Sequence, residues 1–329
     1  MKKITMQDIA DKLNISKNSV SQALSNKPGV SENTRDLIIK TADELGYIYK
    51  NQTSSISKPK YLGLIASDFA FSKKSFFGEI FLSLEKECKE QGYALLTQSI
   101  SDFDKENLNF PYFIEQNMIE GLFIVSHISN NYIQKILETN IPAILVDHHN
   151  PRFLCDAVLT NNRLGSYQAV KHLIEKGHTR IGFMGDVQFS PSYYERLDGY
   201  LLASKEFSLE PDYSIILDSI EEKQDVIFEK LSSLEHHPTA WICVNDGLGY
   251  FALSYYQENN FKIPYDIAIC NFDNGYLSRV SKPNITTIDI NLKYYGKKAF
   301  SQLLTRIENP DEPFIEILLP TSLIERESS

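Results

Sequence analysis

The chain of 329 residues contains few cysteines, and they form no redox or zinc-binding motif. The four are far apart and include no Cys-x-x-Cys pair: Cys88, Cys155, Cys243 and Cys270. We therefore expect them to be small buried hydrophobic side chains in a reducing compartment. The histidine pairs His148-His149 and His236-His237 are adjacent in sequence, whereas two metal ligands on one helix need i, i+4 spacing. We expect solvated loop histidines and no bound metal.

The chain also lacks a long hydrophobic run. No stretch approaches 18 continuous apolar residues, and no apolar run separates Lys2-Lys3 from the first helix signals. These absences predict neither a membrane-spanning helix nor an export signal, so we expect a cytoplasmic protein without a membrane partner.

Motifs of common enzyme classes are missing as well. The sequence has no Gly-x-Gly-x-x-Gly after a strand, no Gly-x-x-x-x-Gly-Lys-Ser/Thr and no Gly-x-Ser-x-Gly. Nothing in it therefore indicates dinucleotide binding, triphosphate binding or a nucleophilic serine. We expect no catalytic residue and no cofactor.

Residues 5 to 46 carry the signals of three short helices with a tight turn. Thr5 and Asp8 stand at the N-cap and N3 positions of a capping box, and an apolar stripe follows at Ile9, Ala10 and Leu13. Asn14 stands where the turn needs a left-handed residue. This layout is typical of a helix-turn-helix DNA-binding module.

The second helix carries the side chains best suited to DNA. Ser16 can cap this helix, and its inward face consists of Val20, Ala23 and Leu24. Its outward face carries Lys17, Asn18, Ser21 and Gln22. Amide side chains can bond adenine bidentately, whereas a lysine suits a phosphate.

The third helix starts at Ser31, with Thr34 in place of the usual acid of a capping box, and Gly46 is its stop signal. Its predicted apolar stripe consists of Leu37, Ile38, Ala42 and Leu45. We expect DNA contacts from this head and the linker behind it at Thr5, Ser16, Lys17, Asn18, Ser21, Gln22, Asn26, Ser31, Thr34 and Ile56.

Charge separates this head from the rest of the chain. Residues 1–60 carry ten Lys and Arg against six Asp and Glu, whereas the remainder carries 23 against 37. A phosphate backbone would be repelled by the acidic bulk, so non-specific attraction must come from the basic head. DNA binding should therefore weaken steeply with salt.

After residue 60, short apolar runs alternate with longer stretches of helical period. The runs are Tyr61–Ala66, Tyr93–Gln98, Gly121–Val125, Ala143–Val146, Ile181–Met184, Ser214–Leu217, Ala240–Val244 and Ile267–Asn271. Such alternation predicts parallel sheets covered by helices on both faces. About 270 residues are more than one hydrophobic core usually accommodates, so two sheets are expected. A ligand cleft is expected at the carboxyl ends of their strands.

Blocks along the whole chain resemble the LacI/GalR family of transcription regulators. In the head they are Gln7-Asp8-Ile9-Ala10, Ile15-Ser16-Lys17-Asn18-Ser19-Val20-Ser21, Val30-Ser31-Glu32-Asn33-Thr34-Arg35 and Glu44-Leu45-Gly46-Tyr47. In the core they are Gly63-Leu64-Ile65, Ile119-Glu120-Gly121-Leu122, Glu175-Lys176-Gly177-His178-Thr179-Arg180-Ile181, Glu195-Arg196-Leu197-Asp198-Gly199-Tyr200, Asn245-Asp246, Asn271-Phe272-Asp273 and Thr286-Thr287.

The resemblance implies a helix-turn-helix head and a core of two periplasmic-binding-protein-like subdomains joined by three chain crossings. We place the head at residues 1–47, the linker or hinge at 48–60 and the core at 61–329. The N-subdomain then spans about 61–160 plus 292–319, and the C-subdomain about 163–287 plus 322–329.

The linker departs from the family pattern. Relatives carry Pro-Asn and then an Ala-Arg-x-Leu hinge helix whose Leu wedges into the minor groove. Here Tyr49-Lys50 replaces the Pro-Asn pair, Thr53-Ser54 replaces Ala-Arg, and Ile56 takes the Leu position. Ile56 can still act as a wedge, but Thr and Ser are poor helix formers. The family also usually has Arg where Gln22 stands.

The resemblance also assigns effector-binding positions in the core. Asn245 and Asp273 match positions that bond ligand hydroxyls, and Arg196 matches one that clamps a sugar oxygen or an acidic group; the alternative is a plain ion pair between Arg196 and Asp273. The pair Phe76-Phe77 aligns with aromatics that stack a ligand, and Ser192 can donate to it. Tyr193 and Tyr194 suit pocket lining or helix packing equally, and Trp241 is expected in the core.

The resulting prediction is a regulator that binds a pseudo-palindromic operator as a homodimer and responds to a sugar-like effector, and the resemblance implies that it is a repressor. A sugar-binding receptor and a carbohydrate-handling enzyme with an appended head are the alternatives; the enzyme would need an acid–base pair from Asp68, Glu195 and Asp273. The stripe Ile80-Phe81-Leu84-Cys88 suits a dimer interface or an ordinary core, and the absence of a Leu heptad at the C-terminal end favours a dimer over a tetramer.

Overall fold

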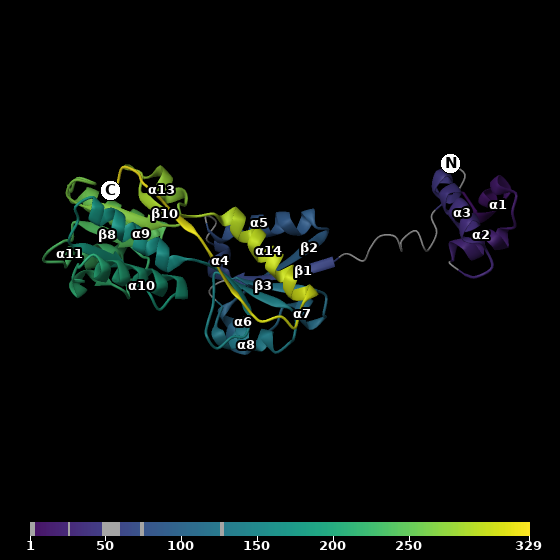
Figure 1. Ribbon diagram of the computed structural model, residues 1–329, viewed down its shortest axis with the longest axis horizontal. Coiled ribbons are helices and arrows are strands. Elements are labelled where there is room, and N and C mark those ends of the chain that lie inside the picture. The colour runs from purple at the N-terminus through teal and green to yellow at the C-terminus, as the bar shows by residue number, and fades with distance from the viewer. Residues whose placement is uncertain (1–3, 26, 48–59, 73–75, 126–127) are drawn as a thin grey trace. The chain divides into compact units, whose positions relative to one another are not determined.

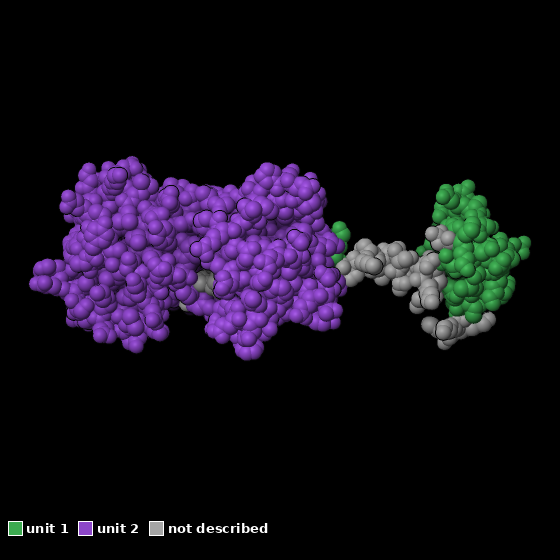
Figure 2. Space-filling model, turned by 90° about the horizontal axis from the view of Figure 1, so that it is seen from below, with its two compact units in different colours: residues 1–60 green, residues 61–329 purple. Residues whose placement is uncertain are grey.

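The computed structural model describes the chain apart from residues 1–3, 26, 48–59, 73–75 and 126–127. It divides into two compact units, residues 1–60 and residues 61–329, which Figure 1 draws as ribbons and Figure 2 distinguishes by colour. The predicted linker residues Tyr49, Lys50, Thr53, Ser54 and Ile56 lie outside the described residues, and so does Asn26.

The first unit consists of α1 (Met6–Leu13), α2 (Lys17–Leu24) and α3 (Glu32–Leu45). The capping box of Thr5 and Asp8 is present, and the side chain of Ser16 accepts a hydrogen bond from the backbone of α2. Asn14 has φ 53° and Gly46 has φ 70°, so both helix ends turn through the left-handed region. The three predicted helices and their cap signals are therefore confirmed.

The core of this unit differs from the prediction at one position. Ile38 and Ala42 are buried as expected, but Leu37 is 53% exposed, and Thr41 is buried in its place. Positions 38, 41, 42 and 45 share one helical face, whereas residue 37 is rotated away from it. The predicted stripe was wrong at Leu37.

The second unit contains two six-stranded sheets, each with helices packed against it (Figure 1). The first sheet has the order β11-β5-β4-β3-β1-β2. Its strands are β1 (Lys60–Ser67), β2 (Tyr93–Ile100), β3 (Gly121–Val125), β4 (Ala143–Val146), β5 (Asp156–Thr160) and β11 (Glu316–Leu319). The chain enters this sheet at Lys60, which was expected in the linker.

The second sheet has the order β12-β10-β9-β8-β6-β7. Its strands are β6 (Ile181–Met184), β7 (Ile216–Leu217), β8 (Ala240–Cys243), β9 (Ala268–Phe272), β10 (Thr286–Ile290) and β12 (Thr321–Ile324). A 3₁₀ turn, η2 (Tyr213–Ile215), leads into β7, so only the second half of the run expected from Ser214 is strand. The other strand pairs of this sheet are parallel as predicted, and only the edge strand β12 runs antiparallel to its neighbour β10.

Helices cover these sheets and pack in pairs, α5 with α14, α9 with α10 and α11 with α12. Around the first sheet they are α4 (Asp68–Ser72), α5 (Phe77–Glu90), α6 (Asp102–Asn107), α7 (Tyr112–Glu115), α8 (Asn130–Leu137) and α14 (Leu292–Glu308). Around the second they are α9 (Asn162–Glu175), α10 (Pro191–Glu206), α11 (Gln224–Ser232), α12 (Asp246–Glu258) and α13 (Tyr276–Val280).

The chain passes between the two sheets three times within the described core. It leaves the first sheet after Thr160, returns to it after Ile290 and leaves again after Leu319. These passages divide the core into an N-lobe built on the first sheet and a C-lobe built on the second. In the expected stripe of α5, Ile80, Leu84 and Cys88 are fully buried in the core of the N-lobe, and Phe81 is half-buried and packs against that core.

Candidate functional site

The outward face of α2 is the candidate DNA-reading surface of the first unit. Lys17 and Asn18 are exposed, and Ser21 and Gln22 are half-buried. A Cβ added at Gly29 would meet the Gln22 side-chain oxygen at 3.0 Å, so the Gln22 amide lies against the loop before α3. Any side chain at residue 29 would therefore crowd the side chain of Gln22.

Three of the predicted DNA-contacting hydroxyls are occupied in helix caps. Thr5 Oγ1 donates to Asp8 at 2.6 Å, the amide of Ser19 donates to Ser16 Oγ at 3.0 Å, and the amide of Thr34 donates to Ser31 Oγ at 3.3 Å. The Thr34 and Ser31 hydroxyls are 2.8 Å apart. These side chains hold the ends of the helices in place, and any DNA contact would use their remaining hydrogen-bonding capacity.

Arg35 has a structural function that the sequence pattern did not reveal. Its Nη1 donates to the carbonyl of Ala23 at 3.0 Å, and its Nη2 donates to that of Lys27 at 2.8 Å. The guanidinium thereby ties α3 to the end of α2 and to the loop behind it. An arginine in the first turn of a helix gives no such signal in sequence, because its partners come from an earlier element.

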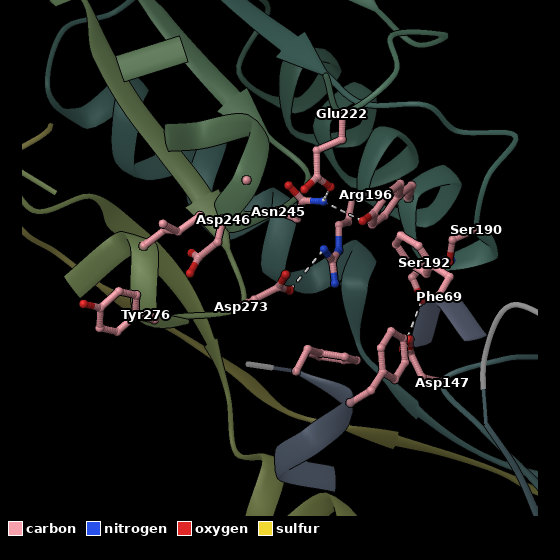
Figure 3. Close-up of a pocket in the computed structure, with 15 residues that line it drawn as sticks. Phe69, Asp147, Ser190, Ser192, Arg196, Glu222, Asn245, Asp246, Asp273 and Tyr276 are labelled. Carbon is pink, nitrogen blue, oxygen red and sulfur yellow. Dashed lines mark hydrogen bonds and ion pairs between the residues drawn. The ribbon is translucent and has the colours of Figure 1, made fainter. Parts of the chain in front are cut away.

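A cavity of about 170 Å³ lies between the N-lobe and the C-lobe (Figure 3). All six predicted effector residues line it: Phe76, Phe77, Ser192, Arg196, Asn245 and Asp273. The lining also contains Tyr193, which the sequence left open, and Phe69, an aromatic expected at the same strand–helix junction as Phe76 and Phe77. The residues that the sequence did not indicate are Asp147, Ser190, Glu222, Asp246, Gly247, Tyr276 and Leu277. Tyr194 is 54% exposed and does not line the cavity, and Trp241 is fully buried in the C-lobe as expected.

Arg196 is held at the cavity by several partners. Its Nε donates to Asn162 Oδ1 at 2.9 Å, and its Nη1 donates to the Val244 carbonyl and lies 3.4 Å from Asp273 Oδ1. The guanidinium also lies over the Phe272 ring, 4.2 Å from its centroid. The ion pair proposed as an alternative therefore exists, but it does not remove Arg196 from the cavity, and the same side chain can also meet a ligand.

Asn245 connects the cavity wall to a helix. Its Oδ1 accepts from the amide of Leu248 and caps α12, while its Nδ2 donates to Tyr193 Oη at 2.7 Å and Glu222 Oε2 at 2.6 Å. The amide is thus oriented by its own contacts. A ligand hydroxyl at this position would share these donors and acceptors.

Two polar contacts join the N-lobe to the C-lobe beside the cavity. Ser192 Oγ donates to Asp147 Oδ1 at 3.1 Å, and His149 Nε2 lies 3.1 Å from Glu195 Oε1. Hydrogen bonding to Glu195 raises the pKa of His149. These contacts hold the lobes together around the cavity.

The histidine prediction was wrong at three of four positions. His148 is buried, neither of its ring nitrogens is hydrogen-bonded to a described residue, and burial lowers its pKa to about 4. His149 is ion-paired, and His237 is half-buried with Nδ1 3.0 Å from Tyr256 Oη. Only His236 is exposed. In the folded protein, the two lobes and the region around β8 cover the histidine loops that were expected to be exposed to solvent.

Burial controls the charge of two carboxyl groups in the cavity. Burial raises the pKa of Asp147 to about 7 and that of Asp273 to about 7, although Arg196 acts on both in the opposite direction. A low-dielectric site disfavours the ionised form, and one guanidinium does not compensate two carboxylates. Both groups therefore titrate near neutral pH in the unliganded protein.

The arrangement suits recognition rather than reaction. Asp68 is exposed on α4 and does not line the cavity, and Glu195 and Asp273 are engaged with His149 and Arg196. Among the described residues, no cluster of His, Cys, Asp and Glu could hold a metal ion. In the same part of the chain, no helix has the length and apolarity needed to cross a membrane.

Known proteins resemble both units. Residues 5–49 match the family model described as bacterial regulatory proteins, lacI family, and residues 170–329 match the periplasmic binding protein-like domain. The HTH-type transcriptional repressor PurR of Vibrio atlanticus (strain LGP32) is 25% identical over 328 residues, which cover 98% of this chain and 97% of that protein.

Two solved structures share the fold over nearly the full length. The lac repressor dimer bound to operator and the anti-inducer ONPF has a TM-score of 0.74 at 20% identity, covering 99% of both chains. The transcriptional regulator CelR–cellobiose complex also has a TM-score of 0.74, at 22% identity, covering 99% of this chain and 100% of that one.

Proposed function

Because the chain belongs to the LacI family of transcription regulators, we propose that it is a repressor that binds a pseudo-palindromic operator as a homodimer. We further propose that a small polyhydroxylated effector, a sugar or sugar derivative, binds in the cavity between its lobes. The domain limits 1–47, 48–60 and 61–329 belong to this proposal. The enzyme alternative is not retained, because the relatives are non-enzymatic regulators.

One observation supports the proposal that a polyhydroxylated effector binds in the cavity. Arg196, Asn245 and Asp273 come from three elements of the C-lobe and converge on one cavity (Figure 3), which Phe76 and Phe77 of the N-lobe also line. A guanidinium, an amide and a carboxyl group together donate and accept hydrogen bonds, while the aromatic rings offer a flat apolar wall. This combination suits a polyol ring. The CelR structure holds cellobiose, which supports the same class of ligand.

Signal transmission is proposed to use the contacts between the lobes. An effector that contacts Ser192 and Arg196 in the C-lobe together with Phe76 in the N-lobe would bind best at one lobe spacing. It would then shift the equilibrium between spacings and alter the DNA-binding heads of the dimer. Release from DNA and corepression are both compatible with this mechanism.

The proposed operator binding rests on the exposed residues in the N-terminal half of α2. One head of this size buries little surface, so two copies on two half-sites are needed for specificity. The relative PurR is named a repressor, and the lac repressor structure contains a dimer on its operator, which supports this assignment.

Operator binding can be tested with a site selected from random DNA by the purified protein. We expect Asn18→Ala to weaken binding by about 1–3 kcal/mol and to relax preference at one position in each half-site. Lys17→Ala should weaken binding to all sequences alike and, because the dimer loses two phosphate contacts, reduce the salt slope by about two. Gel retardation over a salt series measures both effects.

Lys171→Ala is the matched control, because Lys171 is an exposed lysine of the core, paired with Glu175 at 3.7 Å. Its affinity and salt slope should match the wild type. If Asn18→Ala and Lys17→Ala also behave like wild type, α2 is not the reading helix.

A further inference from the structure

Asn162 occupies a buried position where the chain has just passed from the N-lobe to the C-lobe. It is the first residue of α9, is 1% exposed, and follows the last residue of β5, Thr160, by two positions. It does not line the effector cavity. Its amide nevertheless contacts the side chain of Arg196, which does line the cavity.

The Asn162 amide lies between two charged side chains of opposite sign. Its Nδ2 donates to Glu195 Oε2 at 2.9 Å, and its Oδ1 accepts from Arg196 Nε at 2.9 Å. A guanidinium can only donate and a carboxylate can only accept, so the group between them must do both. An asparagine amide does this in one fixed orientation. Its Nδ2 also donates to the Thr160 carbonyl at 3.3 Å, which connects it to the end of the N-lobe strand β5.

Gly199 explains how the amide reaches both charged groups. Glu195 and Arg196 precede Gly199 in α10 by four and three positions, so the three residues share one face of the helix. A Cβ added at Gly199 would meet the Arg163 carbonyl oxygen at 2.2 Å. The start of α9 can therefore approach α10 this closely only because residue 199 is a glycine, and the approach brings Asn162 against Glu195 and Arg196.

The other carboxylate oxygen of Glu195 contacts the N-lobe. Its Oε1 lies 3.1 Å from Nε2 of His149, which follows β4. Nδ1 of the same ring lies 3.4 Å from Oε1 of Glu316 in β11. Glu195 thus makes one contact within the C-lobe, to Asn162, and one contact between the lobes, to His149.

Arg196 connects the amide to the effector cavity. Its Nη1 lies 3.4 Å from Asp273 Oδ1 (Figure 3) and donates to the Val244 carbonyl. Because a guanidinium is planar and rigid, bonds at Nε and Nη1 together fix the direction of the whole group. A ligand oxygen would therefore meet Arg196 in a direction that the bond to Asn162 helps to set.

From these contacts we infer that Asn162 is a positioning residue, which orients Arg196 toward the effector and joins it to the Glu195–His149 contact between the lobes. This inference rests on the proposed effector function of the cavity. When a ligand oxygen binds Arg196, the guanidinium shifts together with the amide, and the amide holds Glu195 at the lobe contact. Effector binding and lobe contact therefore depend on each other.

The test replaces the amide by a carboxylate of the same shape. Asn162→Asp keeps the acceptor for Arg196 but places an oxygen against Glu195 Oε2, and two carboxylates in contact repel each other. The Asn162→Asp/Glu195→Gln double variant moves the amide to residue 195, where it can donate to residue 162 and accept from His149. The net charge of the double variant equals that of the wild type. A purely steric role for Asn162 predicts no rescue by the second substitution.

The probe is the sugar among D-glucose, D-galactose, D-ribose, D-fructose, maltose and cellobiose that most raises the melting temperature of the full chain. Its dissociation constant is measured by isothermal titration calorimetry. We expect Asn162→Asp to weaken sugar binding roughly tenfold or more. The double variant should return the dissociation constant to within roughly threefold of the wild type.

A second measurement tests the connection to the lobe contact. Gel retardation with and without saturating sugar gives the change in operator affinity that the sugar causes. A residue that only oriented Arg196 would alter the sugar concentration required and leave this change at saturation as it is. We expect Asn162→Asp to reduce the change at saturation roughly twofold or more, and the double variant to restore it.

Asn161→Asp is the matched control, because it makes the same substitution one residue earlier. Asn161 Oδ1 caps α9 by accepting from the amide of Leu164 at 3.1 Å. An aspartate caps a helix as well as an asparagine does. The sugar affinity and the operator response of this variant should equal those of the wild type.

The outcomes separate the inference from the proposed function. If folded Asn162→Asp binds the sugar like the wild type, or if the double variant is not restored, the inference is overturned and the effector function stands. An unchanged response at saturation overturns the connection to the lobe contact. If no sugar raises the melting temperature while the operator is still retarded, the sugar-like effector and the inference are both rejected.

A cooperative melting transition shows whether each variant is folded. If Asn162→Asp alone does not fold, the double variant is compared with Glu195→Gln. Equal sugar affinity of these two variants supports the inference, because residue 162 then tolerates a carboxylate once residue 195 can donate to it. Binding that is roughly tenfold weaker in the double variant overturns it.

Discussion

At the residue scale, Asp147 combines a position in the wall of the cavity with a cost in stability. It is 4% exposed, accepts a hydrogen bond from Ser192, and has a pKa raised to about 7 by burial. In the unfolded chain the same carboxyl ionises near pH 4. The folded state therefore loses stability relative to the unfolded state as pH rises from about 4 to about 7.

We predict that Asp147→Asn stabilises the unliganded protein at pH 8 and has much less effect at pH 5. The asparagine can still accept from Ser192 but avoids the buried charge. The difference between a pKa of about 7 in the folded protein and about 4 in the unfolded chain sets an upper bound of about 4 kcal/mol on the gain in unfolding free energy. Urea unfolding at the two pH values measures it.

Asp311→Asn serves as the control, because Asp311 is exposed and its substitution should change the unfolding free energy by less than about 0.5 kcal/mol. A gain for Asp147→Asn that does not depend on pH would show that the charge of Asp147 is not its source.

Single residues also show how far sequence could predict the site. Arg196, Asn245 and Asp273 stand in motifs that resemble a known family, so they could be placed. Asp147 and Glu222 follow short strands in segments without a motif, and the groups that act on Asp147, such as Arg196 and Ser192, come from the opposite lobe. Their part in the cavity depends on contacts that no local pattern contains.

At the element scale, β5 shows how a strand can escape prediction. All five of its residues are buried, yet it begins with Asp156 and ends with Thr160, so it does not form an apolar run. Asp156 is tolerated because Arg306 of α14 bonds it twice, with Nε at 2.8 Å from Oδ2 and Nη2 at 3.1 Å from Oδ1. The amide of Ile315, just before β11, also donates to Asp156 at 2.8 Å.

Arg306→Met should destabilise the core by about 3–5 kcal/mol, because it leaves the fully buried Asp156 carboxylate without its counter-charge. Denaturant unfolding of the full chain measures this loss. A small effect would mean that Asp156 is neutral in the folded protein.

Arg163→Met is the matched comparison, because Arg163 pairs with Asp198 at 3.0 Å on the surface, where its side chain is 61% exposed. Such a pair contributes about 0–1 kcal/mol. The difference between the two variants isolates the effect of burial.

At the scale of the whole molecule, the two compact units have opposite charge and separate cores. The head is built around Ile9, Val20 and Ile38, and the lobes are built around their own sheets. The basic residues of unit 1 and the acidic excess of unit 2 assign phosphate attraction to the head.

Deleting residues 1–59 should abolish operator retardation while leaving the core folded and its effector affinity within about twofold of the full chain. Gel retardation, calorimetry and the melting temperature measure these three properties. Loss of effector binding along with DNA binding would contradict the division into two functional units.

The sequence by itself determined the helical head, the alternation of strands and helices in the core, the charge contrast and the family. These properties arise from caps, periodicity and composition, which depend on residues within a few positions of one another. The tertiary structure alone decided the burial of Asp156 and His148, the exposure of Leu37 and the convergence of carboxyl groups on the cavity beside Arg196. Burial, and the pKa shifts it causes, depend on which distant elements pack together, and chain neighbours do not specify that packing.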